Sequence, residues 1–365
     1  MSGPGAPRTV VFVSAVIGHG GPNASLRMIV PHLAGVQPVL VGPYEEGERD
    51  EWQREGVEVV HIPRPRGLRK LAAAAWNVFR ALRNAPRDRV VVANGLTEAA
   101  LVAPSLLLLR VRGLVWIHNY AVPRPARALA PILRRQYERG RWRLAAVSEV
   151  AATVGRSVFG PGAEFAIVPN PIRPVDDTSL RARAPAAGGR LRVSYAAGTD
   201  RPYKGFDLLP DIIERTDDCG FDWRIVAAVG NQPQAWSRLR EVSERLESSQ
   251  VEIRGRTRRI EELYDGVDVI LIPSRQESFC RVAAEAMAFG AAVVAARLPA
   301  IEEVCGDVAF YFAPGDAEAA ALTLREVAGS PGALAEAQQQ GRRVVQRFTP
   351  SKVLDGFEGI LQSVR

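Results

Sequence analysis

The amino-acid sequence predicts an α/β protein of two doubly wound domains, each a parallel sheet with helices on both faces. Short apolar runs typical of buried strands alternate with helical patterns along the whole chain. Residues 171–190 interrupt this alternation with Pro, Ala, Arg and Gly in no regular period, as a linker does. The 365 residues suffice for two cores. We therefore expect domains over residues 1–170 and 191–347, followed by a helix within 348–365.

The first domain opens with a buried strand at Thr9–Ala15, which leads into a glycine loop, Gly18–Asn23, and a helical pattern. A strand, a glycine loop and a helix in this order can hold a phosphate. The dinucleotide pattern G-x-G-x-x-G is incomplete because Asn23 takes the place of the third glycine, and Glu45 alone keeps that reading open. A glycine turn is more often a tight connection than a ligand site.

The rest of the first domain is expected to contain six more strands: Pro38–Gly42, Val57–Ile62, Arg89–Asn94, Leu114–His118, Leu144–Ser148 and Phe165–Val168. His118 ends its strand, at the sheet edge where parallel sheets bind ligands, although an isolated histidine is usually structural. Thr97 is predicted to cap the helix that ends near Leu109. Residues 126–143 are predicted to be mostly helical, with Pro131 at a start or a kink.

The second domain is expected to contain five strands: Leu191–Gly198, Trp223–Val229, Val251–Arg254, Val269–Pro273 and Ala291–Ala296. Lys204 and Gly205 follow the first of these strands and precede a helical pattern, and Arg201 stands just before them. A lysine and an arginine beside a helix N-terminus would neutralise a departing diphosphate. Taken singly, such residues are more often surface charges.

Residues 268–307 form the most informative stretch, with the order strand, polar loop, short helix and strand. The helix is predicted over Arg281–Phe289, and Gly290 stands where a helix C-terminus prefers glycine. A diphosphate on the unpaired N–H groups of Ser278 to Arg281 would leave one polyol near Glu277 and another near Glu285. A nucleotide sugar has this layout. The simpler interpretation is a solvated loop acid and an exposed helix position.

This stretch resembles the signature of family 4 retaining glycosyltransferases of the GT-B type. Its residues Glu277 and Glu285 have the family's spacing, and the positions that agree with the family are Ser278, Phe279, Ala286, Met287, Ala288 and Gly290. Cys280 departs from it, since glycine is commoner there. Lys204 and Gly205 match the family's second signature, whereas its arginine is replaced by Thr199 and Arg201 stands two residues later.

The resemblance implies two Rossmann-like domains facing each other across a cleft, with the last helix, Ser351–Val364, returning to the first domain. It implies that Glu285 binds ribose, that Glu277 binds the sugar hydroxyls and that His118 faces the transferred sugar. The remaining implied donor contacts are Lys204 and Arg201 to the diphosphate, Gly20 and Gly21 by close backbone approach, the helix-mouth residues Ser278, Phe279 and Cys280, and the loop Gly255, Arg256 and Thr257 beside the base. No cofactor and no metal are implied, since the nucleotide diphosphate sugar is a substrate.

The composition fits a globular protein, with 47% hydrophobic and 24% charged residues. Three widely spaced cysteines, Cys219, Cys280 and Cys305, argue against a disulfide scaffold or a structural zinc and for a reducing compartment. The N-terminus lacks an export pattern, and the longest apolar stretch, residues 101–117, is broken by Pro104 and two arginines. We therefore expect a cytoplasmic location, either free or peripheral on the inner face of the membrane.

The positive charge is concentrated in the first half. Residues 1–170 contain 22 Lys and Arg against 12 Asp and Glu, a net charge of +10, within a total of +7. The helix predicted within residues 126–143 has Arg127, Arg134 and Arg135 around apolar positions, the pattern of a basic amphipathic helix. It is either a solvated face or a contact with an anionic membrane surface or an acidic acceptor. Nucleic acid is disfavoured, because too few aromatic residues are present to stack bases.

These observations together predict a retaining glycosyltransferase that moves a sugar from a nucleotide diphosphate donor to an acceptor held mainly by the first domain. The acceptor class stays open among glycans, lipid-linked molecules and small molecules. Another GT-B enzyme, such as a nucleotide-sugar epimerase or a phosphorylase, is the first alternative. A non-catalytic binding protein on the same fold is the second, and the combination of Glu277, Glu285 and Lys204 disfavours it.

Overall fold

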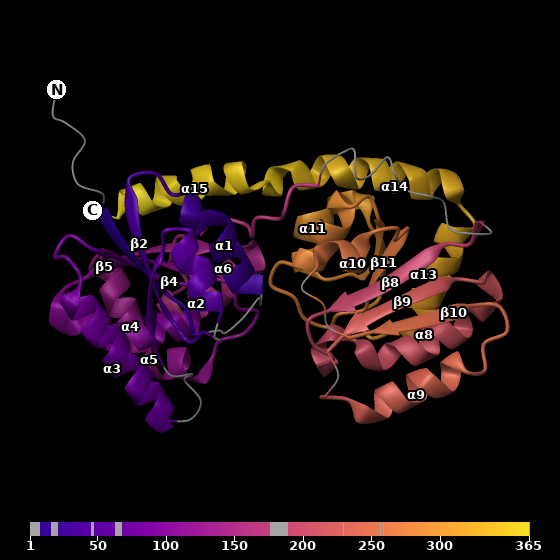
Figure 1. Ribbon diagram of the computed structural model, residues 1–365, viewed down its shortest axis with the longest axis horizontal. Helices are drawn as coiled ribbons and strands as arrows, with labels where there is room; N and C mark the ends of the chain where they lie inside the picture. The colour runs from indigo at the N-terminus through magenta and orange to yellow at the C-terminus, as the bar shows by residue number, and fades with distance from the viewer. Residues whose placement is uncertain are drawn as a thin grey trace. The chain divides into compact units, whose positions relative to one another are not determined.

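The computed structural model of the protein describes residues 8–15, 21–44, 47–62, 68–175, 189–228, 230–255, 257 and 259–364 (Figure 1). The chain forms two compact units. Unit 1 comprises Met1–Pro171 together with Pro350–Arg365, and unit 2 comprises Ile172–Thr349. Within the described ranges, no helix is long and apolar enough to cross a membrane.

Unit 1 is built on a parallel sheet of seven strands in the order β3-β2-β1-β4-β5-β6-β7. Its strands are β1 (Arg8–Val13), β2 (Val36–Gly42), β3 (Glu58–His61), β4 (Val90–Ala93), β5 (Arg112–Ile117), β6 (Trp142–Ala146) and β7 (Ala166–Ile167). All four residues of β4 are fully buried, because helices cover both faces of the sheet. Apolar runs therefore identified these strands well.

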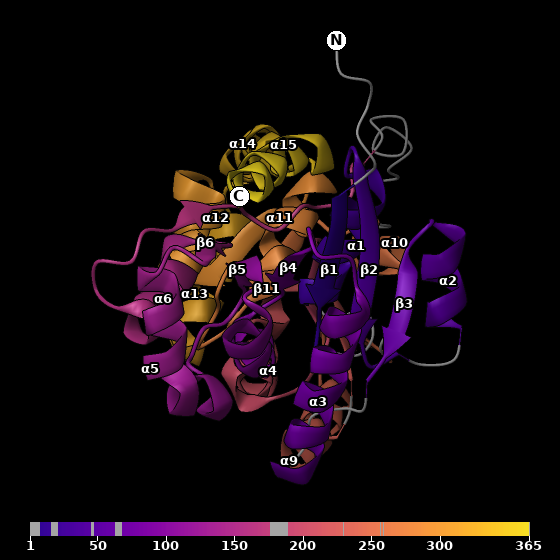
Figure 2. The same ribbon diagram turned by 90° about the vertical axis from the view of Figure 1, so that its left-hand side faces the viewer.

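The helices of unit 1 are α1 (Gly21–Ile29), α2 (Glu48–Arg54), α3 (Leu68–Asn84), α4 (Leu96–Leu109), α5 (Arg124–Glu138), α6 (Glu149–Phe159) and α15 (Pro350–Ser363), and the short 3-10 helix η1 (Val30–His32) follows α1. Helices α3, α4, α5 and α6 pack side by side in this order, as Figure 2 shows. Helix α15 packs on unit 1 through Phe357, whose ring lies 6.4 Å from Phe12 and 5.1 Å from Trp116 between centroids. The C-terminal segment thus completes the core of unit 1.

One prediction about unit 1 is wrong, and a second is correct over most of its range. Thr97 does not cap α4, which begins at Leu96 after Gly95; the Leu96 N–H instead donates to Asn119 Oδ1 over 3.0 Å. The helix predicted within residues 126–143 ends at Glu138, and Trp142 already begins β6. The arginines at the end of that range therefore lie on a turn and a strand.

Unit 2 is built on a parallel sheet of six strands in the order β10-β9-β8-β11-β12-β13. Its strands are β8 (Arg192–Ala197), β9 (Asp222–Ala227), β10 (Gln250–Arg254), β11 (Val269–Ile272), β12 (Ala292–Ala296) and β13 (Phe310–Phe312). The last of these was not predicted. The unit has its own core, in which Phe206, Trp223 and Trp236 are almost fully buried.

The helices of unit 2 are α8 (Leu209–Arg215), α9 (Pro233–Ser243), α10 (Ile260–Tyr264), α11 (Arg281–Ala288), α12 (Pro299–Cys305), α13 (Ala317–Ala328) and α14 (Pro331–Val344). Its 3-10 turns are η3 (Pro202–Lys204), η4 (Phe206–Leu208), η5 (Asp217–Cys219), η6 (Gly306–Val308) and η7 (Val345–Phe348). Helix α11 stops before Gly290, whose φ of +79° explains the glycine predicted there.

Candidate functional site

Three of the predicted donor residues, Arg201, Lys204 and Glu277, lie on the two loops that leave the unit 2 sheet where its strand order reverses. The chain leaves β8 toward β9 on one side, whereas β11 pairs with β8 on the other side. The loops that follow β8 and β11 leave the same edge of the sheet in opposite directions. Ligands of open parallel sheets collect at such a point, outside the carboxyl ends of the strands.

The loops after β8 and β11 are fastened to each other. The Arg275 N–H donates to the Tyr203 carbonyl oxygen over 2.7 Å, and the Arg275 guanidinium binds both carboxylate oxygens of Asp207 over 2.7 and 2.8 Å. The Tyr195 hydroxyl also donates to the Lys204 carbonyl oxygen over 3.3 Å. A bidentate ion pair such as that of Arg275 and Asp207 restricts the positions of both side chains. The backbone that carries Lys204 is therefore held beside the loop that carries Glu277.

Lys204 and Glu277 form an ion pair at this junction. Lys204 Nζ lies 2.6 Å from Glu277 Oε1, which also accepts a hydrogen bond from the Ser274 hydroxyl over 2.9 Å. The two side chains are 21% and 10% exposed, so Glu277 is not a solvated loop acid. Burial lowers the pKa of Lys204, but the surrounding groups, with the Glu277 carboxylate foremost, together outweigh burial and the net shift is upward. Lys204 is therefore a cation near neutral pH.

The loop after β11 turns into α11 through Cys280, which has a φ of +62°. A left-handed backbone is costly for a residue with a side chain, which gives a physical reason why the resembled family favours glycine here. Cys280 is buried, and burial raises the pKa of its thiol well above the usual range. The preceding Phe279 is also buried and packs edge-on against Phe348, with 5.2 Å between centroids. Ser278, which lies between Glu277 and Phe279 in the chain, is half-buried.

Glu285 lies inside unit 2, not on an exposed helix face. It is 9% exposed; its Oε2 accepts a hydrogen bond from the Tyr264 hydroxyl over 2.9 Å, and its Oε1 lies 3.5 Å from the Arg281 guanidinium. Burial raises the pKa of Glu285, and Arg281 and Tyr264 oppose that shift. The carboxylate is thus oriented by two polar partners, as buried polar groups usually are.

The other predicted donor residues have different surroundings. Thr257 donates its hydroxyl to Glu262 over 2.6 Å and accepts the Arg259 N–H over 3.1 Å, so it orders the start of α10. Arg201 is exposed at the start of η3. Chain neighbours aside, no atom of the described residues lies within 4 Å of a β-carbon built on Gly255. Gly20 and Arg256 lie outside the described residues.

In unit 1, the structure describes two of the predicted residues. His118 directly follows β5, and its ring packs on Trp116 with 4.5 Å between centroids. The Trp116 indole donates to the Val168 carbonyl oxygen over 2.9 Å, which fixes the surface beneath the histidine. Gly21 is the first residue of α1 and is exposed; leaving its chain neighbours aside, no atom of the described residues lies within 4 Å of a β-carbon added to it.

Sequence reasoning missed Asp200, which is fully buried just after β8. It accepts N–H hydrogen bonds from the backbone of Gly230, Asn231 and Gln232 over 3.0 to 3.2 Å, and from the Trp236 indole over 2.9 Å. Burial raises the pKa of Asp200, but the hydrogen bonds outweigh it and hold the pKa below the usual range. Asp200 thus holds the loop after β9 beside the loop after β8, which carries Lys204.

A second missed acid, Glu98, lies in the first turn of α4 in unit 1 and is 3% exposed. Its Oε1 accepts the Ala15 N–H over 2.8 Å, and burial raises its pKa to about 7. Asn94 follows β4 and is 2% exposed, with neither polar side-chain atom hydrogen-bonded among the described residues. Both lie by the neighbouring strands β1 and β4, where the order of this sheet reverses.

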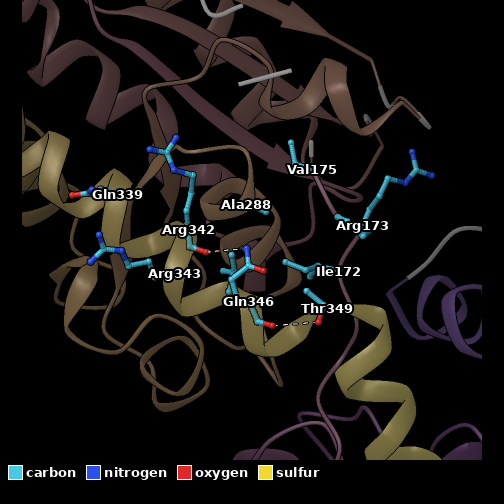
Figure 3. A pocket seen from close by; sticks show the side chains of 11 residues that line it. Ile172, Arg173, Val175, Ala288, Gln339, Arg342, Arg343, Gln346 and Thr349 are labelled. Atoms are coloured by element: carbon cyan, nitrogen blue, oxygen red, sulfur yellow. Dashed lines mark hydrogen bonds between the residues drawn. The ribbon is translucent and has the colours of Figure 1, made fainter. Parts of the chain in front are cut away.

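A separate pocket of about 310 Å³ lies in unit 2, and none of the predicted donor contacts lines it. Figure 3 shows Arg173 from the segment before β8, and Arg342 and Arg343 from α14, around it. Its complete lining is Ile172, Arg173, Pro174, Val175, Ala288, Gln339, Arg342, Arg343, Val345, Gln346 and Thr349. Arg173 Nη1 is 3.7 Å from Glu261 in an exposed pair, so the pocket is basic and open to water.

Comparison with known proteins agrees with the geometry of unit 2. Residues 190–330, the segment that carries Lys204, Glu277 and Glu285, match the family model described as Glycosyl transferases group 1, in agreement with a resemblance to glycosyltransferases. The chain also has the GT-B fold of two Rossmann-like domains, as solved glycosyltransferases do. No curated protein sequence matches the chain.

Three solved structures illustrate the likeness in fold. HepE from Anabaena, solved with UDP-glucose, is 17% identical with a TM-score of 0.79, over 97% of this chain and 99% of that one. A glycosyltransferase from Rickettsia africae is 15% identical with a TM-score of 0.75, over 98% of each chain. Sucrose-phosphate synthase from Thermosynechococcus elongatus is 15% identical with a TM-score of 0.75, over 98% of this chain and 99% of that one.

Proposed function

We propose that the protein is a retaining glycosyltransferase that uses a nucleotide diphosphate sugar as donor. The observation that carries the proposal is the ion pair of Lys204 and Glu277 at the reversal point of the unit 2 sheet. A cation that binds phosphate stands there beside an acid that binds hydroxyls, in a segment that matches a glycosyltransferase family model. HepE has been solved with UDP-glucose and with UDP and glucose, which supports a nucleotide-sugar donor for a chain of the same fold.

The donor is proposed to lie across the loops after β8 and β11. Lys204 and the exposed Arg201 neutralise the diphosphate, and the N–H groups of residues 278–281 at the mouth of α11 contribute further positive potential. Glu277 accepts the sugar hydroxyls and Glu285 the ribose hydroxyls. Gly255 and Thr257 lie beside the base. The proposal contains no cofactor and no metal, since these groups supply the charge.

Transfer breaks the bond between the anomeric carbon and the diphosphate oxygen, and the electron pair leaves with the nucleoside diphosphate. The acceptor hydroxyl oxygen forms the new bond to the anomeric carbon on the same face of the sugar. Its proton passes to an oxygen of the departing diphosphate, so no protein nucleophile is required. Lys204 stabilises the charge that develops on the diphosphate, and His118 is assigned to the reacting end of the sugar.

Nucleoside diphosphate release from UDP-, GDP-, dTDP- and ADP-sugars tests this proposal. Each donor is incubated alone, with a panel of monosaccharides, and with an anionic lipid extract, and the anomeric configuration of any product is read by ¹H NMR. We expect release that depends on an added acceptor and a product with the configuration of the donor.

The alternatives give different results. A phosphorylase would require inorganic phosphate for release, and an epimerase would change the donor sugar without any acceptor. A binding protein would be stabilised by a donor without turning it over. An inverted product would reject retention while leaving transfer intact.

A further inference from the structure

Helix α3 presents an exposed side that combines cationic and aromatic residues. Its positions Ala74, Val78 and Leu82 are fully buried and hold it on unit 1. The outward positions recur at intervals of three and four residues and are Arg69, Ala73, Trp76, Arg80 and Arg83. The helix contains no acidic residue. We call these five positions the outer stripe of α3.

Trp76 stands out from the other tryptophans of the chain. It is 59% exposed, whereas Trp52, at 4%, is the next most exposed of the six. Its ring packs on its own helix against Phe79, with 5.5 Å between centroids and an angle of 24°. A single exposed apolar residue is common on protein surfaces, whereas several exposed together indicate an interaction site, so the residues around Trp76 decide what it indicates.

The neighbouring helix also exposes apolar side chains. Helix α4 packs beside α3, as Figures 1 and 2 agree, and its last turn exposes Leu107 by 49% and Leu108 by 71%. The exposed residues Arg110 and Arg112 follow at once. Two adjacent helices of unit 1 therefore each pair exposed apolar side chains with exposed arginines.

The sequence indicated α5 as the candidate membrane contact, whereas the structure assigns that role to α3 and α4. The apolar side of α5 is covered by unit 1, since Ala126 and Leu133 are fully buried and Leu129 and Ile132 are half-buried. None of the large exposed apolar side chains found in the described ranges lies on α5. Its arginines are thus a solvated basic face.

We propose that the outer stripe of α3, together with the last turn of α4, docks unit 1 on an anionic lipid bilayer. Trp76, Leu107 and Leu108 enter the headgroup region, where amphipathic aromatic rings are stable. The surrounding arginines contact lipid phosphates while their stems cover apolar surface. The absence of acids along α3 gives the charge complementarity that selects this occupant. The inference deepens the proposed function, because it places a membrane-associated acceptor within reach of unit 1.

The experiment uses the full chain with vesicles of phosphatidylglycerol and phosphatidylcholine, and vesicles of phosphatidylcholine alone, at low and high salt. We expect co-sedimentation with the anionic vesicles that high salt weakens. Tryptophan emission should shift to the blue on binding and be quenched by brominated lipids, and Trp76→Phe should remove most of both signals because the other tryptophans are buried.

Matched charge reversals locate the surface. Arg80→Glu with Arg83→Glu on α3 should weaken partition at least about tenfold, whereas Arg127→Glu with Arg135→Glu on α5 should weaken it far less. Equal loss in both pairs, loss only in the α5 pair, equal binding to neutral vesicles, or no binding at all would each overturn the proposal. A nucleotide sugar should stabilise the α3 variant as much as it stabilises the wild type. Loss of membrane binding in this variant can therefore be distinguished from a failure of the proposed function.

Discussion

A β-carbon on Gly205 would stand 1.9 Å from the carbonyl oxygen of Pro273, and Gly205 itself has a φ of +69°. Both constraints exclude a side chain. This close approach joins the loop after β8 to the end of β11, and Lys204 is the residue immediately before it.

Gly205→Ala should therefore destabilise unit 2 by about 2–5 kcal/mol, the sum of a left-handed backbone cost and overpacking against backbone. Chemical denaturation measures it. Gly220→Ala is the matched control: its φ is +64°, but the nearest atom to its β-carbon is 3.8 Å away. The control should lose only about 1–2 kcal/mol. Equal losses would show that the contact with Pro273 carries no cost.

Asp200→Asn should destabilise the fold by about 2–4 kcal/mol, because the new amide group would face N–H donors in a buried site. The pKa of Asp200 is lowered in the folded state, so its stabilisation is present above its unfolded pKa and is lost as pH falls through the folded pKa. Urea denaturation between pH 3 and pH 7 should thus show that the difference in the free energy of unfolding between Asp200→Asn and wild type becomes smaller as pH falls. Asp211→Asn, at an exposed pair with Arg238, should change stability by less than about 1 kcal/mol.

Glu98 should make unit 1 less stable as pH rises. Its pKa is raised to about 7, so the unfolded chain ionises first and the free energy of unfolding falls between about pH 4.5 and pH 7, by up to about 3 kcal/mol. Glu98→Gln keeps an oxygen for the Ala15 N–H and removes the titration. In thermal unfolding, the unfolding temperature of the variant relative to that of wild type should be higher at pH 7.5 than at pH 5. A constant difference at both values would contradict the burial of an ionisable Glu98.

Thiol labelling should separate the three cysteines. Cys280 and Cys305 are buried, and burial raises the pKa of each, that of Cys305 to about 12. Cys219 is partly exposed, and burial raises its pKa as well. Because the thiolate is the reactive species, native protein at pH 7.5 should be labelled slowly at Cys219 alone, and at all three sites in denaturant. Rapid native labelling of Cys280 would mean that the turn into α11 opens in solution.

The fold was predictable because parallel strands buried on both faces appear in the sequence as continuous apolar runs. β4 and β11 were found in this way, and Gly290 marked the end of α11 through a local backbone requirement. The cap of α4 was missed because its partner, Asn119, lies 23 residues away and competes with the nearby Thr97. Local patterns cannot register hydrogen bonds from remote parts of the chain.

The same distinction applies to the candidate site. Lys204, Glu277 and Glu285 lie in short signatures, so their spacing was informative. Asp200 and Glu98 carry no local signature: the donors to Asp200 come from about 30 residues later, and the donor to Glu98 lies 83 residues earlier. Their importance follows from burial, which single acidic residues in a sequence do not reveal.

The most direct test of the central claim is the stabilisation of the protein by nucleotide sugars in a matched pair of lysine variants. Lys204→Ala removes the cation of the ion pair, and Lys352→Ala removes an exposed lysine of α15. With the nucleotide sugar that most raises the unfolding temperature of wild type, we predict that the rise persists in Lys352→Ala and disappears in Lys204→Ala. An equal rise in both variants would contradict the assignment of Lys204 to the donor diphosphate.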